Sequence, residues 1–127
     1  MIVGLGTDCI AIARVAACHR RHPRRFLEWV FTGTEQNYCL RATDPAPHLA
    51  VRWAAKEATM KALGCGWADG VQFHHCEVLR HDNGRPQLVL HHRAKAIAEA
   101  LAVTALHLSL SHADGMAIAT VILEARG

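Results

Sequence analysis

The sequence predicts an α+β fold in which a largely antiparallel sheet of hairpins packs against one long helix. The order of the expected elements carries this prediction: one strand comes first, several helices follow, and two hairpins separated by a helix close the chain. The turn pairs Asn83-Gly84 and Asp114-Gly115 mark the hairpins, because such pairs favour the tight turns between antiparallel strands. The 127 residues suffice for one core, so we expect a single domain over residues 1–127.

The first half of the chain predicts one strand followed by helices. An apolar run predicts a short buried strand that ends at Asp8, and helical segments follow with stops near Pro23 and at Gly64. Thr32 and Glu35 have the spacing of a capping box, which predicts the start of another helix. The strand and the three segments expected to be helical are residues 2–8, 10–21, 24–31 and 48–64.

The second half predicts strands. Residues 105–112 alternate cleanly, with three leucines expected on one face and His107, Ser109 and Ser111 on the other. The other expected strands and the helix between the two hairpins are residues 73–80, 86–91, 116–123 and 92–102.

Composition excludes several classes of protein. No apolar run approaches the about 20 residues of a membrane span, and the N-terminus lacks the basic and apolar regions of a signal peptide. The five cysteines are scattered and contain no C-x-x-C pair, which argues against a disulfide framework or a zinc ribbon. We therefore expect a cytoplasmic protein that does not contact a membrane.

Glu57 and Lys61 lie one turn apart on the long helix over residues 48–64. An exposed ion pair on the helix surface is the simplest interpretation. A helical wheel instead places both residues within the arc of small residues, and places Arg52, Lys56 and Thr59 outside it. Charges that face inward need partners, because desolvation costs several kcal/mol per ion. A divalent cation and a phosphate would be suitable partners.

Asp8 and Glu57 together offer two carboxylates on rigid elements. Taken alone, Asp8 could simply cap the next helix. Mg²⁺, however, is typically held by one or two carboxylates together with substrate phosphates and waters, so these two acids suffice. Lys61 would then supply a positive charge to a phosphate.

Histidines are frequent, but only His112 stands out as a candidate, at the end of an expected strand beside a tight turn. It is either a solvated turn residue or part of a site. The pairs at 74–75 and 91–92 are expected on the surface, because neighbours in a strand point to opposite faces and chelate poorly.

Residues 14–26 carry five arginines and no acid, while the whole chain has a net charge of only +3. The segment is either a solvated helix end or a surface for an acidic protein or a nucleic acid. A nucleic acid is the weaker choice, because no recognition motif is visible and the rest of the chain is not strongly basic.

Three segments closely resemble the holo-acyl-carrier-protein synthases, the short phosphopantetheinyl transferases: GLGTDCIAIAR, RWAAKEATMKALG and LSLSHADGMAIATVIL, at 4–14, 52–64 and 108–123. FTGTEQNYC at 31–39 and GRP at 84–86 extend the resemblance in the same order over nearly the whole chain. It implies the 4′-phosphopantetheinyl transferase fold and transfer of 4′-phosphopantetheine from coenzyme A to a serine of apo acyl carrier protein. Adenosine 3′,5′-bisphosphate would be the other product.

The resemblance also implies roles for individual residues. Asp8 and Glu57 match the Mg²⁺ carboxylates, and Lys61 and His112 match groups that bind coenzyme A near its pyrophosphate and assist catalysis. The base that accepts the serine proton is Glu57 or a water on the metal, and the sequence does not choose between them.

Partner binding is implied as well. Arg14, Arg21 and Arg25 are expected to contact the acidic carrier protein, with Cys18 at an apolar position among them. The short members form homotrimers with active sites shared between subunits. Two other functions remain open: a Mg²⁺-dependent enzyme that acts on other phosphate esters, and a binding module without catalysis.

Overall fold

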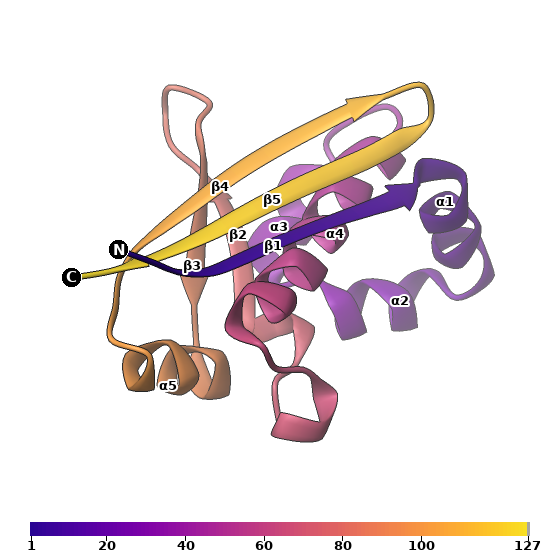
Figure 1. Cartoon of the computed structure of the whole chain (residues 1–127). Coiled ribbons are helices and arrows are strands. Elements are labelled where there is room, and N and C mark those ends of the chain that lie inside the picture. Colours follow the sequence, from indigo (N-terminus) through magenta and orange to yellow (C-terminus); the bar gives the residue numbers. More distant parts are fainter. Residues whose placement is uncertain (127) are drawn as a thin grey trace.

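The computed structural model describes residues 1–126, in which a three-stranded and a two-stranded antiparallel sheet pack against one long helix (Figure 1). The strands are β1 (Ile2–Ala11), β2 (Cys76–Arg80), β3 (Pro86–Leu90), β4 (Val103–Ala113) and β5 (Met116–Ala125). The α-helices are α1 (Ile12–Arg21), α2 (Pro23–Val30), α3 (Gly33–Cys39), α4 (Ala46–Leu63) and α5 (His92–Ala100). Two short 3₁₀ helices, η1 (Trp67–Asp69) and η2 (Phe73–His75), follow α4.

The larger sheet has the order β1-β5-β4, and β2 and β3 form a separate hairpin. Both sheets are antiparallel, so the predicted α+β fold of hairpins against a long helix is confirmed. Asp8 lies opposite Ala119, while His112 at the far edge lies opposite Ala117. Figure 1 shows the three long strands side by side across α4. None of the described helices is both long and apolar enough to span a bilayer.

Glycines let α4 approach β1 closely. A Cβ atom on Gly6 would lie 1.9 Å from the carbonyl oxygen of Ala58, and one on Gly4 would lie 2.3 Å from that of Ala62. Both alanines are buried, so small side chains on the helix and glycines on the strand together allow backbone contact. This contact brings the charged end of α4 next to the strand that carries Asp8.

Several predicted boundaries are confirmed and others are wrong. The capping box of Thr32 and Glu35 is present, and Gly64 ends α4 in the left-handed conformation, with φ of 68°. The strand predicted to stop at Asp8 continues to Ala11, because pairing with β5 continues to Met116. The strand predicted over 73–80 begins at 76, because the preceding residues form η2. In β4 the alternation is confirmed, with half-buried leucines between the exposed residues His107, Ser109 and Ser111.

The prediction that Arg52, Lys56 and Thr59 lie outside the packed face of α4 is wrong. The three are 3%, 0% and 0% exposed. The large sheet covers one side of this helix, and α3, η2 and β2 cover the other. A wheel drawn from one segment cannot show this second layer, so it assigns polar residues to solvent.

Candidate active site

The centre of the site is an ion pair between β1 and α4. The Nζ atom of Lys61 donates to Oδ1 of Asp8 at 3.1 Å and to the main-chain oxygen of Thr7 at 3.0 Å. The side chain of Lys61 is 57% exposed and that of Asp8 is 19% exposed, so the pair lies at the rim of the sheet. Lys61 therefore pairs across to the strand, while much of its side chain stays exposed at the rim.

Glu57 is half-buried on the same side of α4, beside this ion pair. Burial raises the pKa of Glu57, and the nearby Asp8 carboxylate raises it further. The Trp53 indole N–H, Lys61 and Arg14 act in the opposite direction on this pKa. The indole N–H faces Glu57 without completing a hydrogen bond within residues 1–126. Two carboxylates, one lysine and one arginine thus converge from β1, α1 and α4.

The donor set fits Mg²⁺. Asp8 and Glu57 lie close enough for the charge of one to raise the pKa of the other, and a cation between them would remove that repulsion. In the described part of the chain, no group of three or more His, Cys, Asp or Glu side chains could hold a metal by itself. Mg²⁺ needs no such cage, because it usually keeps waters and binds substrate phosphates as well.

His112 lies outside this cluster. It is exposed on β4, the opposite edge of the sheet from β1. Two strand spacings and an offset of two residues separate it from Asp8, which corresponds to roughly 12 Å between Cα atoms. The fold therefore does not bring His112 to the Asp8–Glu57–Lys61 cluster within one chain.

His112 instead borders a basic cavity of about 210 Å³ at the start of α4. His48, Arg52 and Arg80 also line this cavity. The proximity of His112 contributes to lowering the pKa of His48, after burial and Arg52. A neighbouring cavity of about 460 Å³ shares both arginines and adds Arg41. An anion would find several positive groups here.

Arg52 is the functional candidate that sequence reasoning missed. Its guanidinium lies over the Tyr38 ring at 4.5 Å and donates to the oxygen of His48 at 3.1 Å. Its Nε is buried and has no hydrogen-bond partner among the residues that the structure describes. Arg80 donates to the Tyr38 hydroxyl and so flanks the same ring. In the sequence, Arg52 was visible only as one arginine within the long helix, which does not indicate that it lines a cavity.

The arginine-rich segment forms a groove between α1 and α2. Arg21 and Arg25 border a cavity of about 560 Å³ whose other lining residues are Cys18, His22, Phe26 and Trp29. Arg24 points elsewhere and forms an exposed ion pair with Glu28 at 3.1 Å. The helix break at His22 and Pro23 thus places Arg21 and Arg25 at one groove, and Arg14 nearer to Glu57.

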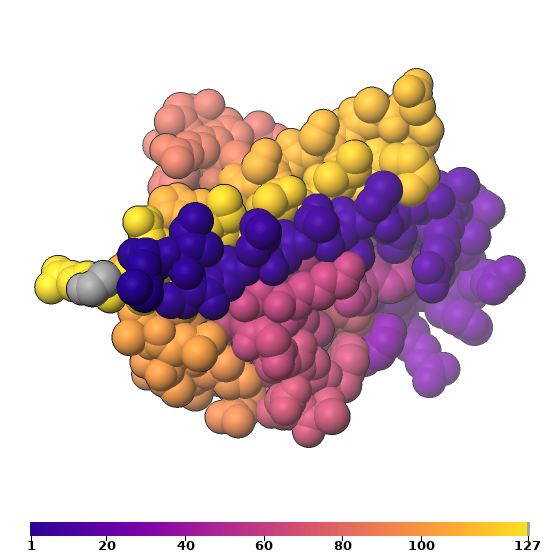
Figure 2. All heavy atoms as spheres, viewed as in Figure 1, coloured from indigo at the N-terminus to yellow at the C-terminus, as the bar shows by residue number. Residues whose placement is uncertain are grey.

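The face of the large sheet that points away from α4 is open and mixes apolar with polar side chains. Leu5 and Ile118 are 65% and 41% exposed, although they lie within paired strands. Figure 2 shows β1 and β5 side by side on the surface, with no other element over them in that view. Leu5 and Ile118 could contribute apolar contacts if another protein surface covered this face.

Comparison with known proteins identifies the family. The sequence profile of the 4′-phosphopantetheinyl transferase superfamily matches residues 4–121. The chain belongs to this superfamily. A holo-[acyl-carrier-protein] synthase of Alkalilimnicola ehrlichii is 47% identical over 125 residues, which are 98% of each chain. The predicted family and the predicted class of enzyme, a phosphopantetheinyl transferase, are confirmed.

Solved structures agree with this placement in the superfamily. The crystal structure of the holo-[acyl-carrier-protein] synthase from Neisseria meningitidis has a TM-score of 0.88 at 28% identity and covers 98% of this chain and 99% of its own. The enzyme from Helicobacter pylori, solved in complex with coenzyme A, has a TM-score of 0.83 at 29% identity. The match to the Helicobacter enzyme covers 94% of this chain and 99% of that one.

Proposed function

We propose that the chain, as one transferase domain in the cytoplasm, moves 4′-phosphopantetheine from coenzyme A to a serine of apo acyl carrier protein and releases adenosine 3′,5′-bisphosphate. The observation that carries this proposal is the convergence of Asp8, Glu57 and Lys61 at one rim of the sheet. It is supported by relatives named holo-[acyl-carrier-protein] synthase and by a similar enzyme that binds coenzyme A.

The chemistry is phosphoryl transfer, in which positioning and charge neutralisation provide most of the catalysis. Asp8 and Glu57 would hold Mg²⁺, which would neutralise charge on the two phosphates of coenzyme A. Lys61 is exposed, and its long side chain could exchange its bond to Asp8 for one to a phosphate oxygen. The serine oxygen bonds to the β-phosphorus, the bond to the bisphosphate breaks, and the serine proton passes to Glu57 or to water.

The basic cavity around His112 and Arg52 would take another phosphate of coenzyme A. Within one chain this cavity and Asp8 lie at opposite edges of the large sheet, and we propose that the complete site forms between two subunits. The open outer face of the sheet, with exposed Leu5 and Ile118 among polar side chains, would be available for contact between copies of the chain. These two features support the expected homotrimer with shared active sites.

The groove between α1 and α2 would bind the carrier protein. Arg21 and Arg25 line it, together with the apolar side chain of Phe26. Arg14 lies closer to Glu57, whose pKa it lowers. An acidic helix of the carrier would meet these arginines and would present its serine toward the carboxylates. Cys18 lies among the lining residues of this groove, at the position expected for an apolar contact.

A direct experiment tests the proposal. The protein is incubated with coenzyme A, Mg²⁺ and an apo acyl carrier protein, and the mass of the carrier protein is measured by mass spectrometry. We expect a gain of one phosphopantetheine group, and none when the carrier serine is replaced by alanine or the metal is chelated. Release of phosphate from nucleotides with an unchanged carrier would favour a hydrolase. Carrier binding without a mass gain would favour a binding module.

A further inference from the structure

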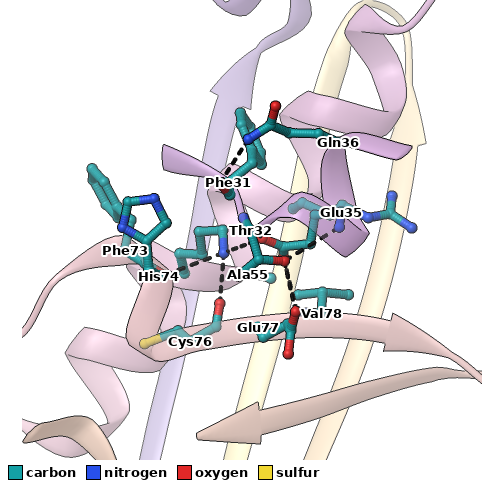
Figure 3. Close-up of polar contacts among 12 residues, drawn as sticks. Phe31, Thr32, Glu35, Gln36, Ala55, Phe73, His74, Cys76, Glu77 and Val78 are labelled. Atoms are coloured by element: carbon teal, nitrogen blue, oxygen red, sulfur yellow. Dashed lines mark hydrogen bonds and ion pairs between the residues drawn. The ribbon is translucent and has the colours of Figure 1, made fainter. Parts of the chain in front are cut away.

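A fully buried ion pair lies beside the candidate site and takes no part in the proposed chemistry. Lys56 is fully buried, and its Nζ donates to Oε1 of Glu35 at 2.7 Å. The same ammonium donates to the main-chain oxygens of Cys76 at 2.7 Å and Phe73 at 3.2 Å. All three of its protons therefore have acceptors. Figure 3 shows this group of contacts, with Glu35 facing β2.

Both carboxylate oxygens of Glu35 also have hydrogen-bond donors. Its Oε1 accepts from the main-chain N–H of Thr32 at 2.8 Å, and its Oε2 accepts from that of Val78 at 2.9 Å. With Lys56, this carboxylate joins α4 to α3, η2 and β2 at a single point. The pair restrains α4 from several directions, because its hydrogen bonds reach three other elements: α3, η2 and β2.

Stability alone does not account for such a pair. Removing two charges from water costs so much that well-packed apolar replacements are often equally stable. Apolar contacts are non-directional, however, whereas hydrogen bonds to the ammonium fix both the rotation and the axial position of α4. The pair therefore supplies directionality that an apolar core would lack.

The position of the pair on α4 matters. Lys56 directly precedes Glu57, and the two side chains leave the helix about 100° apart. Ala58 touches Gly6 on the other side of the helix, so α4 is held from both sides around Glu57. A rotation of α4 by a few degrees would shift Glu57 relative to Asp8, and catalytic constellations tolerate only about 0.5 Å of such error.

We propose that Glu35 and Lys56 are positioning residues for the candidate metal site: their buried ion pair fixes α4 so that the Glu57 carboxylate lies beside Asp8. This inference rests on the proposed function, because it takes the two carboxylates as the ligands of Mg²⁺. It predicts that a variant without the pair still folds but has a clearly lower affinity for the metal ion.

The main test variant replaces both charges with apolar side chains, Glu35→Leu together with Lys56→Met. A single apolar replacement would leave one charge buried with neither its counter-charge nor its hydrogen-bond partner, and would unfold the protein in many cases. The matched control is Thr59→Val, which is buried on the same helix and loses a bond only to Ala55 of that helix. Glu35→Gln is a second variant, since it keeps a carbonyl oxygen for Lys56 if the double variant does not fold.

The readout is binding of Mn²⁺, used in place of Mg²⁺, followed by electron paramagnetic resonance with coenzyme A present and no carrier protein. We expect the double variant, or Glu35→Gln, to bind Mn²⁺ at least tenfold more weakly than the original chain, while Thr59→Val binds normally. In turnover assays the Mg²⁺ concentration for half-maximal rate should rise, and the KM for the carrier should stay unchanged.

Two outcomes would overturn the inference. If Asp8→Asn loses Mn²⁺ binding but the pair variants retain it, the pair is only structural and the proposed function stands. If Asp8→Asn also binds Mn²⁺ normally, the carboxylates are not the metal ligands, and both the inference and the metal part of the proposed function fail.

Discussion

Gly6 of β1 lies directly against the main-chain carbonyl of Ala58 in α4, so closely that a Cβ atom at Gly6 would be 1.9 Å from the carbonyl oxygen. The neighbouring atoms are backbone and cannot move aside as a flexible side chain would. Asp8 follows Gly6 by two residues on the same face of β1, and Glu57 immediately precedes Ala58. This contact therefore determines how far apart the two carboxylates lie.

Gly6→Ala should damage both the fold and the site. The added methyl group must push α4 away, which we expect to cost about 1–3 kcal/mol of unfolding free energy. It should also weaken Mg²⁺ activation, because Glu57 moves with the helix. Denaturant unfolding and an Mg²⁺ titration of turnover measure the two effects. Gly33→Ala is the matched control, since a Cβ atom there meets nothing within 4 Å. Similar behaviour of the two variants would argue against the packing role of Gly6.

Asp8→Asn and Glu57→Gln should each lower turnover by about 100-fold or more, because each removes a charge that would hold the metal. Both substitutions are nearly isosteric, so the circular dichroism spectrum should stay unchanged. The rate is measured across a series of Mg²⁺ concentrations. A variant with the original turnover at limiting Mg²⁺ would show that its carboxylate is not a metal ligand.

Glu57→Gln should stabilise the metal-free fold at neutral pH. The pKa of Glu57 is raised in the folded chain by burial and by Asp8, so the ionised form is disfavoured there relative to the unfolded chain. The resulting penalty is absent below the unfolded pKa of about 4.3, grows as pH rises to the folded pKa, and is constant above it. Partial exposure limits the gain to less than about 1 kcal/mol.

Chemical unfolding of Glu57→Gln and of the original chain between pH 4 and pH 8, in chelator, measures this difference. The gain should vanish toward the acid end of the series. An equal difference at every pH would mean that the glutamate charge is not involved.

Two inactive variants should restore activity when they assemble together. Asp8→Asn lacks one half of a shared site, and His112→Ala lacks the other half. If each site combines Asp8 of one subunit with His112 of the next, about one quarter of the sites in a mixed equimolar assembly are intact. The two variants are unfolded together, refolded and assayed, with each variant alone as control. No recovery, or a monomer by light scattering, would contradict the shared site.

The arginines at the groove between α1 and α2 should affect the carrier and not coenzyme A. Arg21→Ala, Arg25→Ala and Arg14→Ala should each raise the KM for the carrier by about two- to fivefold at low salt. Arg14→Glu should be worse, because like charges then oppose the acidic partner. Both KM values are measured across a salt series, since salt screens exposed charges beyond about 8 Å at physiological strength.

Arg24→Ala is the control for this series, because Arg24 lies next to Arg25 on α2 but pairs with Glu28. An effect of Arg24→Ala equal to that of Arg25→Ala would indicate that only net charge matters. Equal effects on the KM for coenzyme A and the KM for the carrier, or no dependence of the carrier KM on salt, would mean that the carrier binds at another surface.

Features that depend on neighbouring residues were determined by the sequence alone. The Thr32–Glu35 capping box, the end of α4 at Gly64 and the turn at Asp114 each require only a few adjacent side chains and backbone angles. The carboxylate at Glu57 could also be singled out, because its place on the helix follows from the 3.6-residue period.

The tertiary structure alone decided which charges meet. Lys56 resembled a solvent-facing lysine, yet its partners come from about 20 residues away on either side, at Glu35 and Cys76. Lys61 pairs with Asp8, 53 residues away, and His112 lies at the far edge of the sheet. Burial of a charge depends on which elements cover a helix and which groups they offer. That arrangement follows from packing across the chain, which local periodicity does not encode.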